Sequence, residues 1–288
     1  MKERNESNAW LKVENCIKKY GSVTALDSVS FSAGRGVTIL HGRNGSGKST
    51  IISILEGLSP TDEGKISVIG YDPMKNPKKV MENVAFLPER PQVFGANIVG
   101  DFLYWYGEIN HCDYNDLERL LEYFDLRNLI KSKFSNLSSG EKQLIVLSVI
   151  LSSKKKAYVL DEPNANVDSV RRMQIAMEIE KKARTGASLL VTTHMLDDLL
   201  PIADSMIQIK GGRIKKILSR NDIKENTNLT VRIWMSNEQS FQNLADFDIT
   251  VNKDIVDIRG ATVSKILEAL TPEQKENIIS INSVPEMI

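Results

Sequence analysis

Cysteine, histidine and long apolar runs are all scarce in this sequence. It has two cysteines, Cys16 and Cys112, and three histidines among 288 residues. The cysteines lie far apart and in no paired spacing, which excludes a disulfide framework and suits a reducing compartment. No apolar run approaches the roughly 18 residues of a membrane-spanning helix, and the polar start of the chain is unlike a secretory signal. We therefore expect a chain that is soluble by itself.

An excess of charge of either sign is also absent. Lys+Arg and Asp+Glu are equal at 37 each, so no global electrostatic bias indicates nucleic acid as a partner. Hydrophobic residues make up 41% and charged residues 26% of the chain. That composition is typical of globular proteins and excludes intrinsic disorder. The length is enough for one large domain and a smaller one.

Short apolar runs predict the strands of a buried parallel sheet. The runs at residues 37–40, 157–160 and 188–192 are continuous rather than alternating, as in strands covered on both faces. A helical pattern at 170–183 separates the last two, and strand, helix, strand implies a crossover between parallel strands. Residues 94–129 are mostly helical by pattern and are expected to form a helical lobe.

The two ends of the chain carry different patterns. Residues 10–32 mix short alternating runs with turns, and within them residues 23–31 predict a loop that enters a strand. After about Ser219 the composition changes, and four strand-like runs alternate with helix-like stretches at 241–247 and 263–270. The strand-like runs are residues 229–234, 249–251, 255–258 and 278–281.

The order β-α-β-β-α-β is a ferredoxin-like plan. We therefore predict a first domain at residues 1–218 and a small accessory α+β domain at residues 219–288.

A glycine-rich loop follows the first predicted buried strand and opens a predicted helix. It matches the phosphate-binding pattern G-x-x-x-x-G-K-[ST]. Glycines let backbone N–H groups curl around phosphate oxygens, and the positive end of the helix attracts the same anion. We expect Lys48 to reach the β- and γ-phosphates, the Ser49 hydroxyl to bind Mg²⁺, and Thr50 to add a phosphate contact. The loop residues are Gly42, Arg43, Asn44, Gly45, Ser46, Gly47, Lys48, Ser49 and Thr50.

Two adjacent carboxylates end the second predicted strand. Asp161, at the strand tip, is expected to hold Mg²⁺. Glu162 points differently and is expected to polarise the attacking water as a general base. A strand end with two solvated acids is the alternative, which the neighbouring phosphate loop disfavours.

The sequence LSSGEKQ at residues 137–143 resembles the LSGGQ signature of the ATP-binding cassette (ABC) family. The Ser138 hydroxyl, the Gly140 amide and the helix dipole could face a phosphate. Ser138 and Glu141 also form a capping box, and both interpretations can hold together. Ser139 and Glu141 replace a glycine and a glutamine of the family pattern. The resemblance implies nucleotide contacts from Ser138, Gly140 and Glu141.

Other positions match the family in the same order along the chain. Tyr20 matches the aromatic residue that stacks on adenine, although it could also be a surface tyrosine before a turn. His194 matches the switch histidine, and Asp168 matches the acidic residue of the D-loop. Glu89 stands where the family has a glutamine, and a carboxylate there could still reach Mg²⁺ or the attacking water.

The resemblance extends over residues 10–212. It implies a P-loop NTPase cassette with a mostly parallel sheet, an N-terminal antiparallel β part and a helical lobe. ATP and Mg²⁺ are the implied cofactors, and ATP hydrolysis is the implied reaction. The implied catalytic residues are Lys48, Glu162 and His194. The implied metal ligands are Ser49, Glu89 and Asp161.

Two partners follow from the same resemblance. ATP would be held between the phosphate loop of one chain and the signature loop of a second cassette, either an identical copy or a paralogue. Closure would drive a separate transmembrane permease, of export type by the family resemblance, and this chain would lie at the cytoplasmic face of the membrane, bound through the permease. An aromatic stretch at residues 93–106 could be the docking groove for it or a helix of the domain's own core. No nucleic acid partner is expected.

A soluble ABC-type switch that acts on ribosomes or DNA is the alternative function. Translation-factor relatives carry two cassettes in one chain, and DNA-repair relatives carry a long coiled coil between the phosphate loop and the signature. This chain has one cassette and no sustained heptads. For residues 219–288, ligand binding, dimerisation and restraint of turnover remain open.

Overall fold

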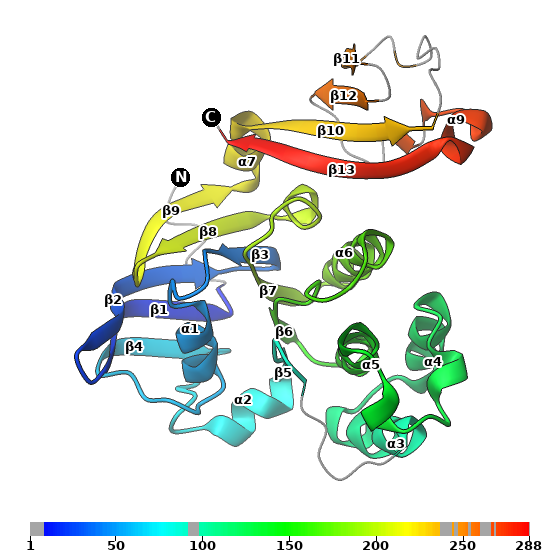
Figure 1. Ribbon diagram of the computed structural model, residues 1–288. Coiled ribbons are helices and arrows are strands. Elements are labelled where there is room, and N and C mark those ends of the chain that lie inside the picture. Colours follow the sequence, from blue (N-terminus) through cyan, green and yellow to red (C-terminus); the bar gives the residue numbers. More distant parts are fainter. Residues whose placement is uncertain are drawn as a thin grey trace. The chain divides into compact units, whose positions relative to one another are not determined.

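The chain folds into two compact units in the computed structural model (Figure 1). The first comprises Met1–His194 and Ile202–Ile217, and the second comprises Met195–Pro201 and Leu218–Ile288. The assignment of residues 219–288 to an accessory role stays a prediction. The residues that the structure describes are 9–91, 98–236, 244, 247–252, 255–259, 266–267 and 269–287.

A six-stranded sheet lies at the centre of the first unit, in the order β5-β6-β7-β3-β8-β9. The pairs from β5 to β8 are all parallel. Every residue of β6 and β7 is buried, as their continuous apolar runs predict. The three predicted buried strands are thus confirmed as β3, β6 and β7. The bounds are β3 Gly36–His41, β5 Val84–Leu87, β6 Ala157–Asp161, β7 Ser188–Thr193, β8 Ser205–Lys210 and β9 Arg213–Ser219.

A three-stranded antiparallel sheet, in the order β2-β1-β4, makes up the N-terminal β part. The loop predicted within residues 23–31 is wrong, because β2 runs unbroken from Val23 to Ala33. Its pairing with β1 shifts register three times, and Asn15 and Ser28 have positive φ angles. Bulges of this kind interrupt the alternation that reveals a strand. The other strands are β1 Leu11–Tyr20 and β4 Glu63–Val68.

One hydrophobic core joins both sheets of this unit through helix α1 (Lys48–Leu55). Ile51, Ile54 and Leu55 of this helix are at most 1% exposed. They pack with residues of β1, β2 and β4 and with residues of the parallel strands. The helix that follows the phosphate loop is therefore fixed on two sides.

Helices account for the rest of the first unit (Figure 1). The helical lobe predicted over residues 94–129 corresponds to α3 and α4, while residues 92–97 lie outside the described part. In the described residues, no helix has both the length and the apolar character to span a membrane. The helices are α2 Pro77–Asn83, α3 Val99–Asn110, α4 Tyr114–Tyr123, α5 Ser139–Ser152 and α6 Ser169–Arg184, with short 3-10 turns at Arg127–Leu129 and Phe134–Asn136. A further 3-10 turn, Leu200–Ile202, includes residues assigned to both units.

The second unit has its own antiparallel sheet, in the order β11-β12-β10-β13. Strand β12 lies between β10 and β11, which is the split arrangement of a ferredoxin-like plan. The helices predicted at 241–247 and 263–270 lie mostly outside the described residues. A separate apolar core includes Val231, Ile233 and Ile258. The elements are α7 Arg220–Asn226, β10 Thr227–Met235, β11 Asp248–Asn252, β12 Ile255–Arg259, α9 Pro272–Glu276 and β13 Ile278–Met287.

Candidate active site

The glycine-rich loop connects the carboxyl end of β3 to the first turn of α1. Two of its glycines are required by the backbone. Gly47 has a φ of +112°, and a Cβ at Gly42 would lie 2.5 Å from the Ile209 carbonyl oxygen. Since α1 begins at Lys48, its free N–H groups and its dipole face the loop, which favours an anion there.

A cavity of about 530 Å³ opens over this loop. Its volume is in the range of small-molecule sites. Besides the loop, it is lined by the carboxylates Glu89, Asp161 and Glu162 and by residues 23–25 and 211–212. The structure therefore brings the predicted phosphate loop and the predicted acidic residues to one place. The loop residues among the lining are Arg43, Asn44, Gly45, Ser46, Gly47, Lys48, Ser49 and Thr50.

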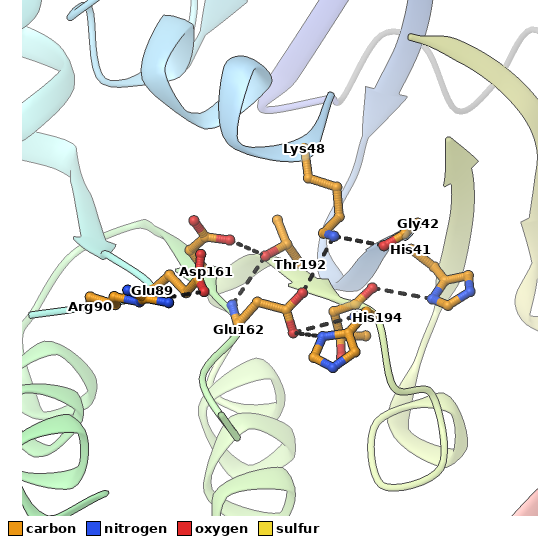
Figure 2. A network of polar contacts seen from close by, with 10 residues as sticks. His41, Gly42, Lys48, Glu89, Arg90, Asp161, Glu162, Thr192 and His194 are labelled. Carbon is orange, nitrogen blue, oxygen red and sulfur yellow. Dashed lines mark hydrogen bonds and ion pairs between the residues drawn. The ribbon is translucent and has the colours of Figure 1, made fainter. Parts of the chain in front are cut away.

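Glu162 is the centre of the polar network in Figure 2. Its Oε2 accepts a hydrogen bond from His194 Nδ1 at 2.9 Å, and the His194 backbone N–H lies 3.3 Å from the same oxygen. Its Oε1 lies 3.4 Å from Lys48 Nζ. Lys48 Nζ also donates to the Gly42 carbonyl at 2.6 Å. Lys48 and Glu162 are both buried, whereas the His194 side chain is 46% exposed.

Thr192 of β7 positions both neighbouring carboxylates (Figure 2). Its hydroxyl donates to Asp161 Oδ1 and accepts from the Glu162 backbone N–H at 3.1 Å. Glu162 has a φ of +45°, which turns its side chain away from the direction of Asp161. Burial raises the pKa of Asp161, and the Thr192 hydrogen bond opposes that shift.

The side chains that could hold Mg²⁺ fit its chemistry. Magnesium is bound through oxygen atoms, usually one or two carboxylates together with substrate phosphates. Asp161 and Glu89 supply carboxylates at the cavity, and Ser49 supplies a hydroxyl at the start of α1. The described residues contain no cluster of three or more acidic, histidine or cysteine side chains that could hold a metal. An ion here would thus depend on the phosphates as well.

Two further titratable groups border the site. Burial lowers the pKa of His41, whose Nδ1 donates to the Thr193 carbonyl at 3.2 Å. Burial raises the pKa of Glu56 to about 7, and the negative charge of Asp161 adds to that shift. Glu56 caps the C-terminal end of α1. It has no place in the predicted site.

Tyr20 does not line the cavity. The residue is 51% exposed, its hydroxyl lies 3.4 Å from Ser59 Oγ, and Lys18 Nζ lies 5.3 Å from the centre of its ring. Glu89 does line the cavity, but it is half-exposed and lies 4.0 Å from Arg90. Adenine stacking by Tyr20 and metal binding by Glu89 therefore stay predictions.

The signature residues lie apart from the cavity lining. Ser138 caps α5 and accepts from the Glu141 N–H at 3.2 Å, while Glu141 Oε2 accepts from the Ser138 N–H at 2.8 Å. These hydrogen bonds lower the pKa of Glu141. A Cβ at Gly140 would lie 2.7 Å from the Asn166 carbonyl oxygen, so only glycine fits. The predicted capping box is present, and the loop is exposed.

Sequence reasoning missed Thr192, and the match of Asp168 to the D-loop of the family stays a prediction. Thr192 is hidden in an apolar strand, and only its register opposite Asp161 gives it a function. Asp168 is the N-cap of α6 and accepts from the Arg171 N–H at 3.0 Å.

This fold and this site define a P-loop nucleoside triphosphatase. Comparisons with known proteins identify the family within this class. The family model described as ABC transporter matches residues 26–165. The linearmycin resistance ATP-binding protein LnrL of Bacillus subtilis (strain 168) is 27% identical over 95% of this chain and 93% of its own length.

The SkfA peptide export ATP-binding protein SkfE of the same organism is 29% identical over 72% of this chain and 88% of its own length. A solved structure of the ATP-binding subunit of an ABC transporter is 26% identical, covers 75% of this chain and 92% of that chain, and has a TM-score of 0.68.

The chain belongs to the ABC family and is an ATP-binding, ATP-hydrolysing transporter subunit. Subunits of this family pair with transmembrane permeases and form dimers.

Proposed function

We propose that Glu162 is the general base of ATP hydrolysis in this subunit. The observation that carries this proposal is the unequal environment of its two oxygens. His194 donates to Oε2, whereas Oε1 accepts no hydrogen bond from the residues that the structure describes and lies 3.4 Å from Lys48 Nζ. A general base must be able to accept the proton of a water molecule within hydrogen-bond reach, and here Oε1 is available for that while Oε2 is held in place. The group that holds Oε2 is His194, which directly follows strand β7.

Lys48 and His194 complete the catalytic group. Lys48 Nζ would leave the Gly42 carbonyl and Glu162 for the β- and γ-phosphates of ATP, which uncovers Glu162 Oε1 for water. His194 Nδ1 is engaged by Glu162, so its Nε2 is the nitrogen available to the γ-phosphate. Mg²⁺, held by Ser49, Asp161 and Glu89, would neutralise phosphate charge. The backbone N–H groups at the N-terminus of α1 are fixed before the reaction, so they stabilise developing charge without reorganisation.

A second cassette would complete the nucleotide site. Ser138, Gly140 and Glu141 lie at the exposed N-terminus of α5 and do not line the cavity of their own chain. A helix N-terminus supplied by a partner chain would add anion-binding donors to the phosphates. We expect a homodimer or a pair with a paralogue, closed by ATP and released by hydrolysis.

The partner at the membrane is a separate permease, and we propose that helix α3 forms part of its docking surface. Tyr104 and Ile109 are 69% and 63% exposed, whereas Phe102 is buried against Phe134. Exposed residues of α3 are therefore available to dock the permease, while other residues of the same helix belong to the domain's own core. The names of LnrL and SkfE refer to resistance and to peptide export. We infer that the permease is of export type and that this chain binds it at the cytoplasmic face of the membrane.

Recovery of the permease tests this assignment. The bait is the Glu162→Gln chain with ATP and Mg²⁺, applied to detergent-solubilised native membranes. We expect a polytopic membrane protein in stoichiometric amount. The matched control is the Lys48→Ala chain, which should not recover it in response to ATP. If the bait recovers only soluble proteins or ribosomes, the transport partner is wrong while the ATPase assignment stands.

We further propose that residues 219–288 form an accessory domain outside the catalytic machinery. Every residue assigned to the site lies before this segment, and its apolar core has its own members. A chain truncated after Ser219 should therefore keep its ATPase activity. A loss of that activity in a truncated chain that still folds, judged by circular dichroism, would assign the domain a role in turnover.

A further inference from the structure

A strongly cationic pocket lies at the opposite edge of the parallel sheet, where β3, β6 and β7 begin. It has a volume of about 490 Å³, and its lining contains no carboxylate. Positive charge is thus concentrated at this pocket, although the acidic and basic residues of the whole chain are equal in number. The cations of the lining are Arg35, Lys154, Lys155, Lys156 and Lys182.

Helix ends explain only part of this charge. Helices α5 and α6 end at Ser152 and Arg184, next to residues of the lining, and each helix C-terminus carries about half a negative charge. Lys182 Nζ donates to the Ser153 carbonyl at 2.9 Å at the end of α5. Two helix ends thus offset about one of the five positive charges, and most of the charge is left.

Counter-charges from side chains offset only part of the remainder, since Asp113 pairs with Lys154 and the charge of Glu82 acts on Lys155. Lys154 Nζ lies 3.2 Å from Asp113 Oδ2, with both side chains partly exposed. Within the described part of the chain, the structure shows no ion pair for Arg35, Lys155, Lys156 or Lys182. Lys155 Nζ donates to the Met81 carbonyl at 2.9 Å, and burial lowers the pKa of this lysine. An anion in the pocket would reduce the repulsion among these cations and would offset the electrostatic cost of burying Lys155.

We propose that this pocket binds a small soluble molecule that carries several phosphate charges. The volume suits one small molecule. Arginine binds phosphate through its planar fork and lysine binds it as a point charge, and both are present. Trp10 lines the same pocket and offers a flat apolar surface beside the cations. The pocket lies at the ends of the strands away from the phosphate loop, so a ligand here would not compete with ATP for the same atoms.

Pyrophosphate is the probe, and calorimetry at low ionic strength is the measurement. All chains carry Lys48→Ala, which weakens phosphate binding at the catalytic loop. Arg35 and Lys156 are exposed, so replacing both with glutamine removes charge without breaking a described ion pair. The matched control replaces Lys131 and Lys133, two exposed lysines outside the pocket, with glutamine. In the Lys48-containing background, unchanged ATP hydrolysis shows that the Arg35→Gln/Lys156→Gln chain is folded.

The proposal predicts saturable pyrophosphate binding to the Lys48→Ala parent and to the control. In the Arg35→Gln/Lys156→Gln chain the affinity should be lower by about tenfold or more, since two charge-assisted contacts are lost. Absence of saturable binding to the parent overturns the proposal, as does equal affinity in the pocket variant and the control. A chain that sediments with phosphatidic acid vesicles but does not bind free pyrophosphate overturns it too, in favour of a lipid headgroup.

Discussion

At the scale of single residues, catalysis depends on how Glu162 is held. Its backbone N–H is fixed by Thr192, its Oε2 by His194, and its Oε1 faces Lys48. The conservative change Glu162→Gln keeps the shape of the side chain and removes its basicity. Because a positioned base contributes about 10²- to 10⁴-fold, we expect phosphate release at saturating ATP and Mg²⁺ to fall at least about 100-fold.

The same substitution on an exposed glutamate serves as the control. Glu63 lies on β4 at a solvent-exposed position, so Glu63→Gln should leave the rate of phosphate release unchanged. Binding of a fluorescent ATP analogue should persist in the Glu162→Gln chain, because the phosphate loop is intact. Hydrolysis by that chain at the wild-type rate would show that another group activates water.

The partly buried acid Glu56 makes stability depend on pH. Burial raises its pKa from 4.5 to about 7, so the folded state holds this proton more tightly than the unfolded state does. The stability that it contributes is full below about pH 4.5 and is lost as the pH rises to about 7. The Glu56→Gln chain does not lose this stability, because glutamine does not ionise. Its free energy of unfolding should exceed that of the wild type by about 1 to 3 kcal/mol at pH 8.

Urea denaturation at pH 5 and at pH 8 measures this effect. The advantage of Glu56→Gln should be small at the lower pH and larger at the higher one. An advantage of equal size at both values would mean that Glu56 titrates alike in the folded and unfolded states.

At the scale of helices and strands, the clearest polar link joins the helical lobe to the sheet domain. Arg119 of α4 donates to both carboxylate oxygens of Glu178 on α6, at 2.8 and 2.7 Å. It also donates to Asp116 at 2.8 Å. Glu178 is 8% exposed, so its charge relies on this partner.

Arg119→Ala should lower the free energy of unfolding by about 1 to 3 kcal/mol, because it leaves a buried carboxylate unpaired. Arg184→Ala is the matched control, since Arg184 pairs with Glu180 on one exposed helix surface with its side chain 76% exposed. That change should stay within about 0.5 kcal/mol. Equal effects of the two substitutions in chemical denaturation would refute a specific role for the Arg119 link.

The sequence predicted elements well where their signal is local and continuous. Strands β3, β6 and β7 follow from apolar runs, and the cap of α5 follows from Ser138 and Glu141. The local pattern did not reveal the hairpin of β1 and β2, because bulges break its alternation, and only the family resemblance implied an antiparallel β part there. The same contrast holds in the site. Lys48, Asp161 and Glu162 stand in contiguous motifs, whereas Thr192 acts only because β6 and β7 pair in one register.

At the scale of the whole molecule, the central claim is that one chain does not form a complete catalytic site. The cavity is lined by the phosphate loop and the acidic residues, but not by the signature residues. Two chains arranged head to tail would provide both, with two equivalent sites in a symmetric dimer. Each site would then combine Lys48 of one chain with Ser138 of the other.

Mixing two inactive variants tests this claim most directly. Lys48→Ala removes the phosphate-loop charge, and Ser138→Arg blocks the signature loop. In a mixed dimer, the intact phosphate loop of one chain meets the intact signature of the other. Random pairing should restore about a quarter of the wild-type ATPase rate, while each variant alone stays inactive. A mixture of two folded variants that remains as inactive as its components would contradict the account, because it would place the signature and the phosphate loop of one chain in the same site.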